Sequence, residues 1–370
     1  MKLSQFKFEL PEEQIAQYPS SYRYNDKGEI ELKEENSLEC DRDECRLMVL
    51  HRKSKTVEHK IFKELINYFD EGDLFLLNDT QVFPARMHGN KEKTNANIEV
   101  FLLRELNERL KLWDVLVEPA RKIRVGNKLY FGPDNSLVAE VIDNTTARGR
   151  TVRFLYDGTH EEFKRDLFAL GRTPLPEHIT REPEPLDAER FQTIYATKEG
   201  SVLAPAAGIN FTREILKRLE IKGVDYDFIS LYLTVNMFRD IDVDDLTKHK
   251  SDSEQIDVSE KVCDLFNKAN KLEKRICAVG TTTLRALETA STANGMIKPF
   301  EGWTNKFIFA PYEFTTANCL ISKLQLPKTS LLMTQSAFAG HEFLMDSYKL
   351  AVKMGYRFGF YGDSVLILPD

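Results

Sequence analysis

The chain has 370 residues, of which 42% are hydrophobic and 29% are charged. This composition is ordinary for a globular protein, and the length allows two domains or one large domain with an insertion. The N-terminal residues, MKLSQFKFELPEEQ, contain no continuous apolar run, so we expect no signal peptide, no membrane anchor and a cytoplasmic protein. The net charge of -7 excludes a chain that is basic throughout.

The cysteines and histidines are dispersed. The five cysteines form no CxxC pair, and the seven histidines form no HxH or HxxxH pattern. An odd number of scattered cysteines argues against a disulfide framework, and the spacing argues against structural zinc. We therefore expect no metal, and we interpret Cys40 and Cys45 as exposed thiols in a polar loop.

The first eighty residues predict the start of an α/β domain. Residues 23–45 are polar and acidic, which is typical of a surface loop or a small insertion. Residues 46–62 predict two strands around a turn at 53–55. A short helix that ends at Gly72 follows, and residues 73–79 have the composition of a buried strand.

From residue 97 the pattern becomes β. Five or six short runs rich in Val, Leu, Ile, Phe and Tyr are separated by Gly, Pro, Asn and Asp, which predicts a small barrel or sandwich. Between Arg86 and Arg153 there are 13 Lys and Arg against 9 Asp and Glu. Such a locally basic unit suits contact with phosphates, and a solvated β-surface explains it equally well.

Beyond residue 158, predicted helices alternate with predicted strands. We expect helices over 161–171, 211–223 and 257–274, the last capped by Asp257 or Ser259. Short apolar runs, including KFIF, CLISK and SLLMT, predict strands between these helices and a final helix and strand.

The predicted fold class is α/β, with a layered α/β main domain and an inserted small β-barrel domain. The main domain is expected to be discontinuous, formed by residues 1–80 and 157–370. Residues 81–156 form the predicted barrel domain.

The segment CAVGTTTLRALE, residues 277–288, has the sharpest local signal. An apolar strand ends at Gly280, and Thr281 and Thr282 open a helix that carries Arg285. Free N–H groups and threonine hydroxyls at a helix start suit a phosphate, a ribose or a carboxylate, and glycine lets a ligand approach the backbone. A plain glycine turn with a threonine cap is the alternative.

Two other segments offer basic side chains to a phosphate backbone. Residues 117–128 place Arg121 and Lys122 in a loop between strands, where an arginine can bridge phosphates. A solvated hairpin is the alternative. Arg86 lies between the two predicted domains, where it can reach a substrate or pin a hinge.

Small residues and one aspartate complete the candidate set. Residues 200–212 include Pro205 and Ala207, and their small side chains permit either close approach to a flat ligand or tight packing. Asp363, near the C-terminus, is a candidate base or cap.

Taken in order, these segments resemble the S-adenosylmethionine:tRNA ribosyltransferase-isomerase family of queuosine biosynthesis. The resemblance covers nearly the whole chain, and the ordered set is far more specific than any one member. The matching stretches are NDTQVFPARMHG, EPARKIRVG, GRTPLPEHI, ERFQTIYA with EGSVLAPAAG, AVGTTTLRALE, GWTNKFIFAPYEF, LPKTSLLM with SAFAG, and YRFGFYGDSVLIL.

The resemblance implies an enzyme that transfers the ribose-derived part of S-adenosylmethionine to the aminomethyl group of a 7-deazaguanine at the tRNA wobble position. The product is epoxyqueuosine-tRNA, and adenine and methionine leave. The resemblance also implies an α/β domain with an inserted barrel, S-adenosylmethionine as co-substrate, tRNA as partner and no metal. Homo- and hetero-oligomers are both compatible with it. Proton removal beside the sulfonium needs a base, and the modified base must leave its stack.

Several positions depart from the family pattern, mainly by loss of histidine or glycine. Asn210 and Gln325 stand where the family usually has histidine, and Lys323 stands where it has asparagine. Residues 232–238 contain no glycine in place of a glycine-rich turn, so bulkier residues should crowd that turn.

Without these histidines, the predicted catalytic groups are Glu254 and Asp363, with Tyr232 as a further choice. Three hypotheses remain open. The chain is an active enzyme, a catalytically impaired paralogue that binds tRNA or a partner protein, or an enzyme of the same fold with a different nucleoside donor. The whole-chain resemblance favours the first.

Overall fold

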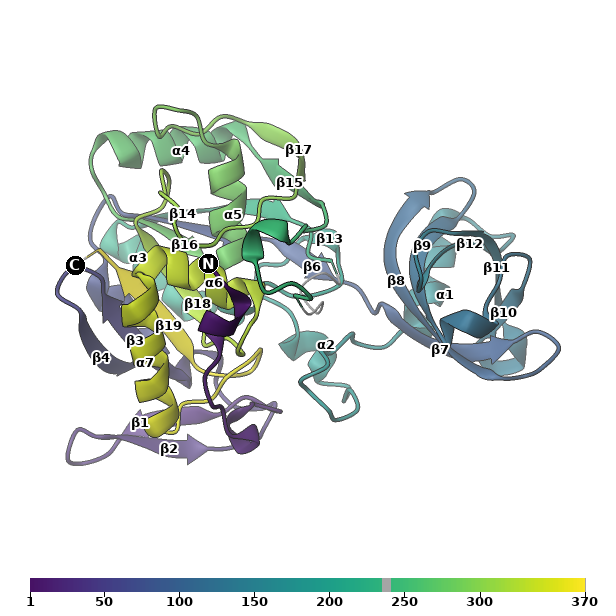
Figure 1. The fold of residues 1–370 in the computed structure, drawn as a ribbon, viewed down its shortest axis with the longest axis horizontal. Helices are drawn as coiled ribbons and strands as arrows, with labels where there is room; N and C mark the ends of the chain where they lie inside the picture. The colour runs from purple at the N-terminus through teal and green to yellow at the C-terminus, as the bar shows by residue number, and fades with distance from the viewer. Residues whose placement is uncertain (235–240, 370) are drawn as a thin grey trace.

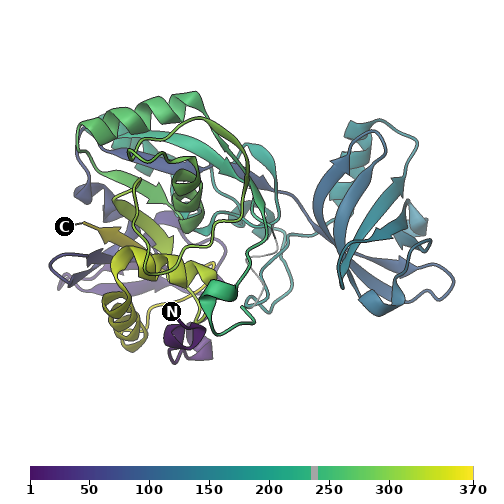
Figure 2. The ribbon, with the colours of Figure 1, turned by 45° about the horizontal axis from the view of Figure 1, so that its top comes forward.

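The computed structural model describes residues 1–234 and 241–369. A larger α/β body and a smaller barrel lie side by side, joined by thin connections (Figures 1 and 2). The predicted fold class, α/β with an inserted β-barrel, is confirmed. Among the described residues, no helix is both long enough and apolar enough to cross a membrane.

The larger body is built on a nine-stranded mixed sheet. Its strands are β3 (Arg46–His51), β4 (Thr56–Ile61), β5 (Leu74–Asn78), β14 (Asp225–Leu231), β15 (Glu254–Val258), β16 (Ile276–Val279), β17 (Phe300–Thr304), β18 (Cys319–Lys323) and β19 (Ser364–Leu368). Their order is β17-β15-β14-β5-β16-β18-β19-β3-β4. The four strands β14, β5, β16 and β18 run parallel, so their carboxyl ends share one edge.

Helices cover both faces of this sheet. They are α3 (Arg213–Lys222), α4 (Glu260–Lys271), α5 (Thr281–Ala290), α6 (Ser330–Ala339) and α7 (His341–Lys353), while the short α2 (Asp187–Arg190) lies in the connection that returns from the barrel. Successive side chains of a strand point to opposite faces. Leu74 and Leu76 of β5 therefore pack with α4 to α7, whereas Phe75 and Leu77 pack with α3 on the other face.

Short 3-10 helices, most of them a single turn, connect many of these elements. They are η1 (Leu3–Phe6), η2 (Glu12–Gln14), η3 (Arg42–Glu44), η4 (Phe62–Tyr68), η5 (Ala120–Lys122), η6 (Pro133–Asn135), η7 (Ala206–Gly208) and η9 (Leu246–Lys248). The predicted short helix before Gly72 is η4, which ends earlier, at Tyr68.

The smaller body is a closed six-stranded barrel. Its strands are β7 (Arg86–Lys91), β8 (Asn97–Asn107), β9 (Leu112–Glu118), β10 (Lys128–Phe131), β11 (Leu137–Asn144) and β12 (Gly149–Leu155). Pairing of β10 with β7 closes it. Helix α1 (His160–Leu170) adds Phe163 and Leu167 to the barrel core. This packing favours an inserted unit that ends after α1 rather than at residue 156; the domain boundaries remain a prediction.

Two small sheets complete the fold, and one of them corrects an expectation. They pair β1 (Ser21–Tyr24) with β2 (Ile30–Glu34) and β6 (Thr80–Val82) with β13 (Lys198–Ser201). Residues 23–45 are predicted to be a surface loop or a small insertion; part of the segment is instead paired, as the β1–β2 hairpin. Cys40 and Cys45 were expected to be exposed, and both are buried, because the segment packs against the core.

Local signals succeeded at helix starts and failed at two short apolar runs, although CLISK forms strand β18 as predicted. Ser259 caps α4 by accepting the Val262 N–H, as one of the two predicted caps. The predicted strand over 330–334 is wrong, because Thr329 caps a helix there, and residues 306–309 form no strand. A short apolar run cannot by itself distinguish a buried helix from a strand.

Candidate active site at the carboxyl edge of the sheet

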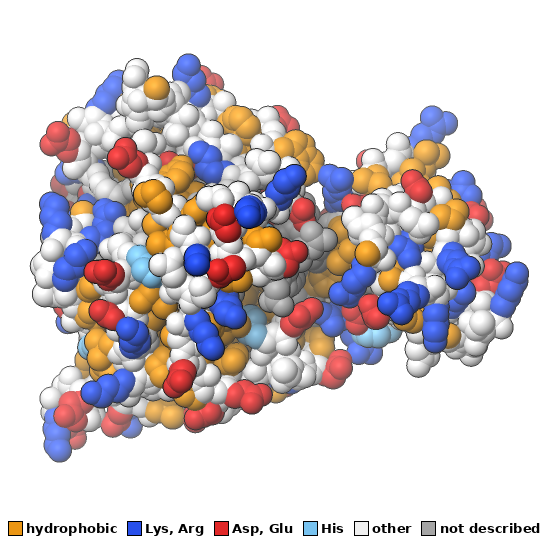
Figure 3. Space-filling view, in the orientation of Figure 1, with side chains coloured by type: hydrophobic (Ala, Val, Ile, Leu, Met, Phe, Trp, Pro, Cys, Tyr) orange, Lys and Arg blue, Asp and Glu red, His pale blue; other side chains and the backbone are white. Residues whose placement is uncertain are grey.

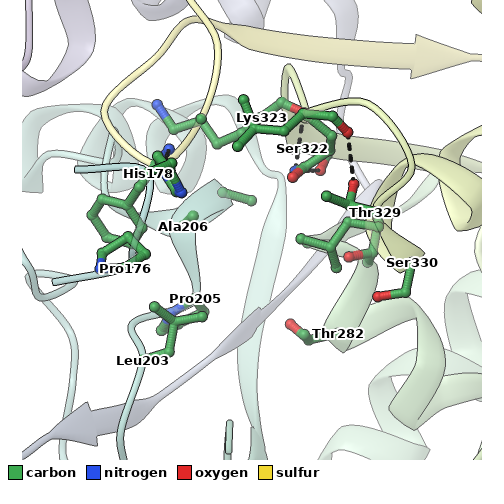
Figure 4. Close-up of a pocket in the computed structure, with 18 of the residues that line it drawn as sticks. Pro176, His178, Leu203, Pro205, Ala206, Thr282, Ser322, Lys323, Thr329 and Ser330 are labelled. Atoms are coloured by element: carbon green, nitrogen blue, oxygen red, sulfur yellow. Dashed lines mark hydrogen bonds between the residues drawn. The ribbon is translucent and has the colours of Figure 1, made fainter. Parts of the chain in front are cut away.

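A cavity of about 380 Å³ lies beside the carboxyl ends of the central parallel strands. Segments that follow β14, β16 and β18 form part of its wall. Figure 4 shows Pro176, His178 and Pro205 on one side, with Ser322, Thr329 and Thr282 on the other. Ligands of α/β sheets bind in this kind of crevice, and the volume suits a small molecule.

The turn between β16 and α5 brings backbone to the cavity. Gly280 has a φ of 103°, which favours glycine. Its N–H donates to the Ile321 carbonyl at 2.8 Å. A Cβ at this position would lie 3.6 Å from the Ala207 side chain. Thr281 and Thr282, the first residues of α5, line the cavity, which places a positive helix end there.

The predicted small-residue wall and a second helix start lie nearby. Pro205 and Ala207 both line the cavity, as do Ser330 and Leu331 at the start of α6. The cavity is therefore bordered by the N-termini of two helices of ten residues each. Free N–H groups from two helix starts can hold a carboxylate or ribose oxygens.

Arg285 and Glu254 form a buried ion pair beside this cavity rather than in its wall. Glu254 is 1% exposed, and its Oε2 accepts a hydrogen bond from Arg285 Nη2. Its Oε1 accepts from the Thr234 N–H at 3.0 Å. Burial lowers the pKa of Arg285 to about 10. Arg285 lines a smaller adjoining cavity that it shares with Thr281 and Thr282.

Asp363 does not line the cavity, and both oxygens of its carboxylate accept hydrogen bonds. Its Oδ1 accepts the Arg46 N–H at 3.0 Å, and its Oδ2 accepts from Arg46 Nη2 at 3.0 Å and from the Arg357 N–H at 2.9 Å. The carboxylate is 2% exposed. These contacts favour a bracing role for Asp363 in the C-terminal turn.

His178 lies in the cavity wall, although the sequence argument counted no histidine there. Its Nε2 accepts the Phe360 N–H at 3.1 Å, and burial lowers its pKa to about 4. The imidazole is therefore neutral near pH 7 and can donate through Nδ1. Glu177 beside it is the one carboxylate among the described lining residues. Both residues belong to the quoted stretch GRTPLPEHI, which was the available signal.

Two of the positions that depart from the family pattern meet in space. Lys323 is 1% exposed, and its Nζ donates to Asn210 Oδ1 and, at 2.6 Å, to the Gly362 carbonyl. Burial lowers the pKa of Lys323. Tyr232 does not line the cavity. The predicted crowding of the turn at 232–238 falls partly on residues 235–240, outside the described residues.

A second cavity, of about 310 Å³, lies between the barrel and the loop at 175–177. Arg86 lines it, 3.5 Å from the Glu99 carboxylate, and its Nη2 donates to the Leu175 carbonyl at 3.4 Å. Glu177 lines both cavities. Arg86 thus lies at the junction of the two bodies, as predicted from its position.

Arg121 and Lys122 line neither cavity; they lie on the exposed η5 turn of the barrel. A residue that the sequence argument missed braces this turn. Arg150 is 6% exposed, and its guanidinium donates to the carbonyls of Ala120 and Ile123 at 2.7 and 3.0 Å. Figure 3 shows Lys and Arg side chains recurring over the barrel.

This fold and site define an α/β enzyme with an inserted barrel and a small-molecule cavity at the carboxyl edge of a parallel sheet. The family model described as "Queuosine biosynthesis protein" matches residues 3–367. The chain therefore belongs to that family.

Similar proteins include S-adenosylmethionine:tRNA ribosyltransferase-isomerases. That of Bacteroides fragilis is 58% identical over 369 residues, covering 100% of this chain and 99% of the relative. That of Phocaeicola vulgatus is 57% identical over 368 residues, with the same coverage. The crystal structure of S-adenosylmethionine tRNA ribosyltransferase from Thermotoga maritima is 30% identical, with a TM-score of 0.52 and coverage of 98% of this chain and 100% of that one.

Proposed function

We propose that this chain transfers and isomerises the ribosyl moiety of S-adenosylmethionine onto 7-aminomethyl-7-deazaguanine at the tRNA wobble position. The product is epoxyqueuosine-tRNA. The observation that carries the proposal is the cavity bordered by the starts of α5 and α6, in a chain that matches its family end to end.

The cavity supplies three kinds of contact that this donor needs. The N-terminal amides of α5 and α6 suit the methionine carboxylate or ribose oxygens. Leu203, Leu233 and Leu326 give the cavity apolar walls that suit a flat ring. Glu177 is the acidic residue in the described lining, and its carboxylate suits the positive charge of the sulfonium.

Two carboxylates are candidates for the base that removes the proton beside the sulfonium. Glu254 is one of the predicted catalytic groups, but Thr234 and Arg285 occupy its oxygens. Glu177 reaches the cavity directly. We propose that Glu254 acts with Arg285 as one unit, in which the carboxylate fixes the guanidinium beside the cavity.

The barrel supplies the RNA contacts in this proposal. Arg121 and Lys122 meet phosphates from the braced η5 turn, and Arg86 meets the nucleotide segment that enters between the two bodies. Positively charged side chains on a rigid turn suit a phosphate backbone.

Isothermal titration with S-adenosylmethionine tests the proposal. We expect micromolar binding by the natural chain and a loss of more than tenfold in Ala206→Trp, which fills the cavity. Ala147→Trp makes the same change in the barrel cavity and should retain binding. Transfer is then assayed on precursor tRNA. No binding by the natural chain, with or without tRNA, would contradict the proposal and favour an RNA-binding or partner-binding role.

A further inference from the structure

A chain of buried side chains lies behind the cavity and serves none of the roles described above. Tyr348 of α7 donates its hydroxyl proton to Gln335 Oε1 of α6 at 2.5 Å. Gln335 Nε2 donates to Ser322 Oγ at 2.7 Å and to the Lys323 carbonyl at 2.8 Å. Tyr348 and Gln335 are 0% exposed, and Ser322 is 2% exposed.

The direction of each hydrogen bond in this chain is fixed. The Lys323 carbonyl can only accept, so the Gln335 atom that contacts it must be the amide nitrogen. The same nitrogen donates to Ser322 Oγ, so Ser322 is the acceptor in that bond. Within the described part of the chain, no group accepts the Ser322 hydroxyl proton. Because Ser322 lines the cavity, that proton is available to a ligand there.

Gln325 places a free acceptor on the same wall. Its Nε2 donates to the Lys323 carbonyl at 3.2 Å, which fixes the orientation of its amide. Its Oε1 accepts no hydrogen bond from the described residues, and Gln325 also lines the cavity. The Gln325 N–H donates to the Tyr348 hydroxyl oxygen at 3.0 Å. One wall thus presents a hydroxyl donor beside an amide acceptor, and Figure 4 shows Ser322 across the cavity from Pro176 and Pro205.

We infer that Ser322 and Gln325 bind the edge of the adenine ring of S-adenosylmethionine. The Ser322 hydroxyl donates to a ring nitrogen, and Gln325 Oε1 accepts from the exocyclic amino group. Adenine presents an acceptor nitrogen beside its amino donor, which matches this pair. Gln335 and Tyr348 are positioning residues, because they hold Ser322 Oγ as an acceptor and so turn its proton toward the ligand. The inference rests on the proposed function.

Binding of ring analogues tests this inference. The probes are S-adenosylhomocysteine and its 1-deaza- and 7-deaza-adenine analogues, each titrated calorimetrically into the full chain. We expect the natural chain to bind one deaza analogue about five- to tenfold more weakly than the parent, the size of one hydrogen bond. Ser322→Ala should bind the parent more weakly by the same factor and lose the discrimination, and Ser322→Thr should restore both.

The positioning residues and the acceptor are tested separately. Tyr348→Phe should reduce the same discrimination, and its effect should not add to that of Ser322→Ala. Gln325→Met, a change of similar size, should weaken the parent ligand about fivefold. Melting curves establish that each variant is folded. If Ser322→Ala does not fold, the inference is tested with Gln325→Met.

Two outcomes would overturn the inference. One is equal binding of all three probes by the natural chain, and the other is full discrimination by Ser322→Ala. In both cases the parent still binds, so the proposed function survives. Failure of the natural chain to bind S-adenosylmethionine would overturn the proposed function together with this inference, whereas binding of S-adenosylmethionine without binding of the parent probe would overturn the inference alone.

Discussion

His178 and Glu254 are both polar residues near the cavity, yet their surroundings differ. His178 has a single hydrogen bond to its Nε2 and borders the cavity. Glu254 is enclosed by Thr234 and Arg285. Removing one partner from a buried carboxylate–guanidinium pair costs stability. At the residue scale, a substitution at either position should therefore preserve as many of the remaining hydrogen bonds as possible.

Glu254→Gln should lower kcat about 100-fold or more, as expected when a catalytic unit loses its charge, and should leave the circular dichroism spectrum unchanged. The amide oxygen can still accept from Arg285, whereas the amide nitrogen then faces the Thr234 N–H, so denaturant melts accompany the assay. The matched variant Glu177→Gln makes the same change at the carboxylate that lines the cavity. Steady-state transfer to precursor tRNA measures both. Full activity in Glu254→Gln with loss in Glu177→Gln would remove the Glu254–Arg285 unit from catalysis and assign the base to Glu177.

His178 should make stability depend on pH. Its pKa is lowered from 6.5 to about 4 in the folded chain, so the unfolded chain binds the proton more readily. Stability from this group is full above pH 6.5 and is lost as the pH falls toward 4, by roughly 3 kcal/mol. His178→Gln keeps an acceptor for the Phe360 N–H and should flatten that part of the curve. Urea unfolding at pH 4.5, 5.5 and 7 measures it; equal slopes in both chains would contradict the prediction.

At the scale of elements, the β16–α5 turn combines a constrained backbone with a ligand wall. Gly280 has its positive φ where the helix begins, and the first turn of α5 faces the cavity. The short η5 turn of the barrel is organised differently. There the buried Arg150 ties down carbonyl groups while Arg121 and Lys122 remain exposed. A substitution in each turn therefore separates the effect of backbone strain on stability from the effect on ligand binding.

Gly280→Ala should destabilise the chain by about 1–2 kcal/mol, because alanine is strained at this φ, and should also weaken S-adenosylmethionine binding. Gly126→Ala is the matched control, since Gly126 has a φ of 83° with open space around it and lies in the barrel. We expect a similar loss of stability there without loss of binding. Denaturant melts and calorimetry measure the two effects. Equal binding by both variants would remove the turn from the site.

At the scale of the whole molecule, the α/β body and the barrel carry different features. The sheet body holds the small-molecule cavity, and the barrel carries the exposed basic turn. Glu177 lines the cavities on both sides of the junction. A tRNA that contacts both bodies can bring its wobble base to the sheet while its backbone rests on the barrel, since phosphate contacts fix register without reading sequence.

Arg121→Ala should weaken tRNA binding and make its dependence on salt shallower by about one unit of slope, the effect of one lost phosphate contact. S-adenosylmethionine affinity should stay unchanged, because the turn lies outside the cavity. Fluorescence titration of tRNA at several salt concentrations measures the slope. Arg109→Ala, another barrel arginine, is the comparison that tests whether the effect belongs to this turn. An unchanged slope in Arg121→Ala would contradict the assignment.

Local chemistry determined what could be predicted from the sequence alone. The α/β class, the barrel and the glycine turn at 280 follow from periodicity and from glycine's backbone freedom, which act over a few residues. The ordered motifs predicted the family, and the comparisons confirm it. The strand expected over 330–334 failed, because a capped buried helix and a buried strand share the same short apolar run.

Only the tertiary structure decided which side chains share the cavity. Glu177 and His178 come from one loop and Ser322 from β18, two segments far apart in the chain that meet at the cavity. Burial decided the surroundings of Glu254 and Asp363, whose partners Arg285 and Arg46 approach from other elements. A sequence shows which groups exist; their neighbours, and hence their hydrogen bonds and charges, depend on packing between distant segments.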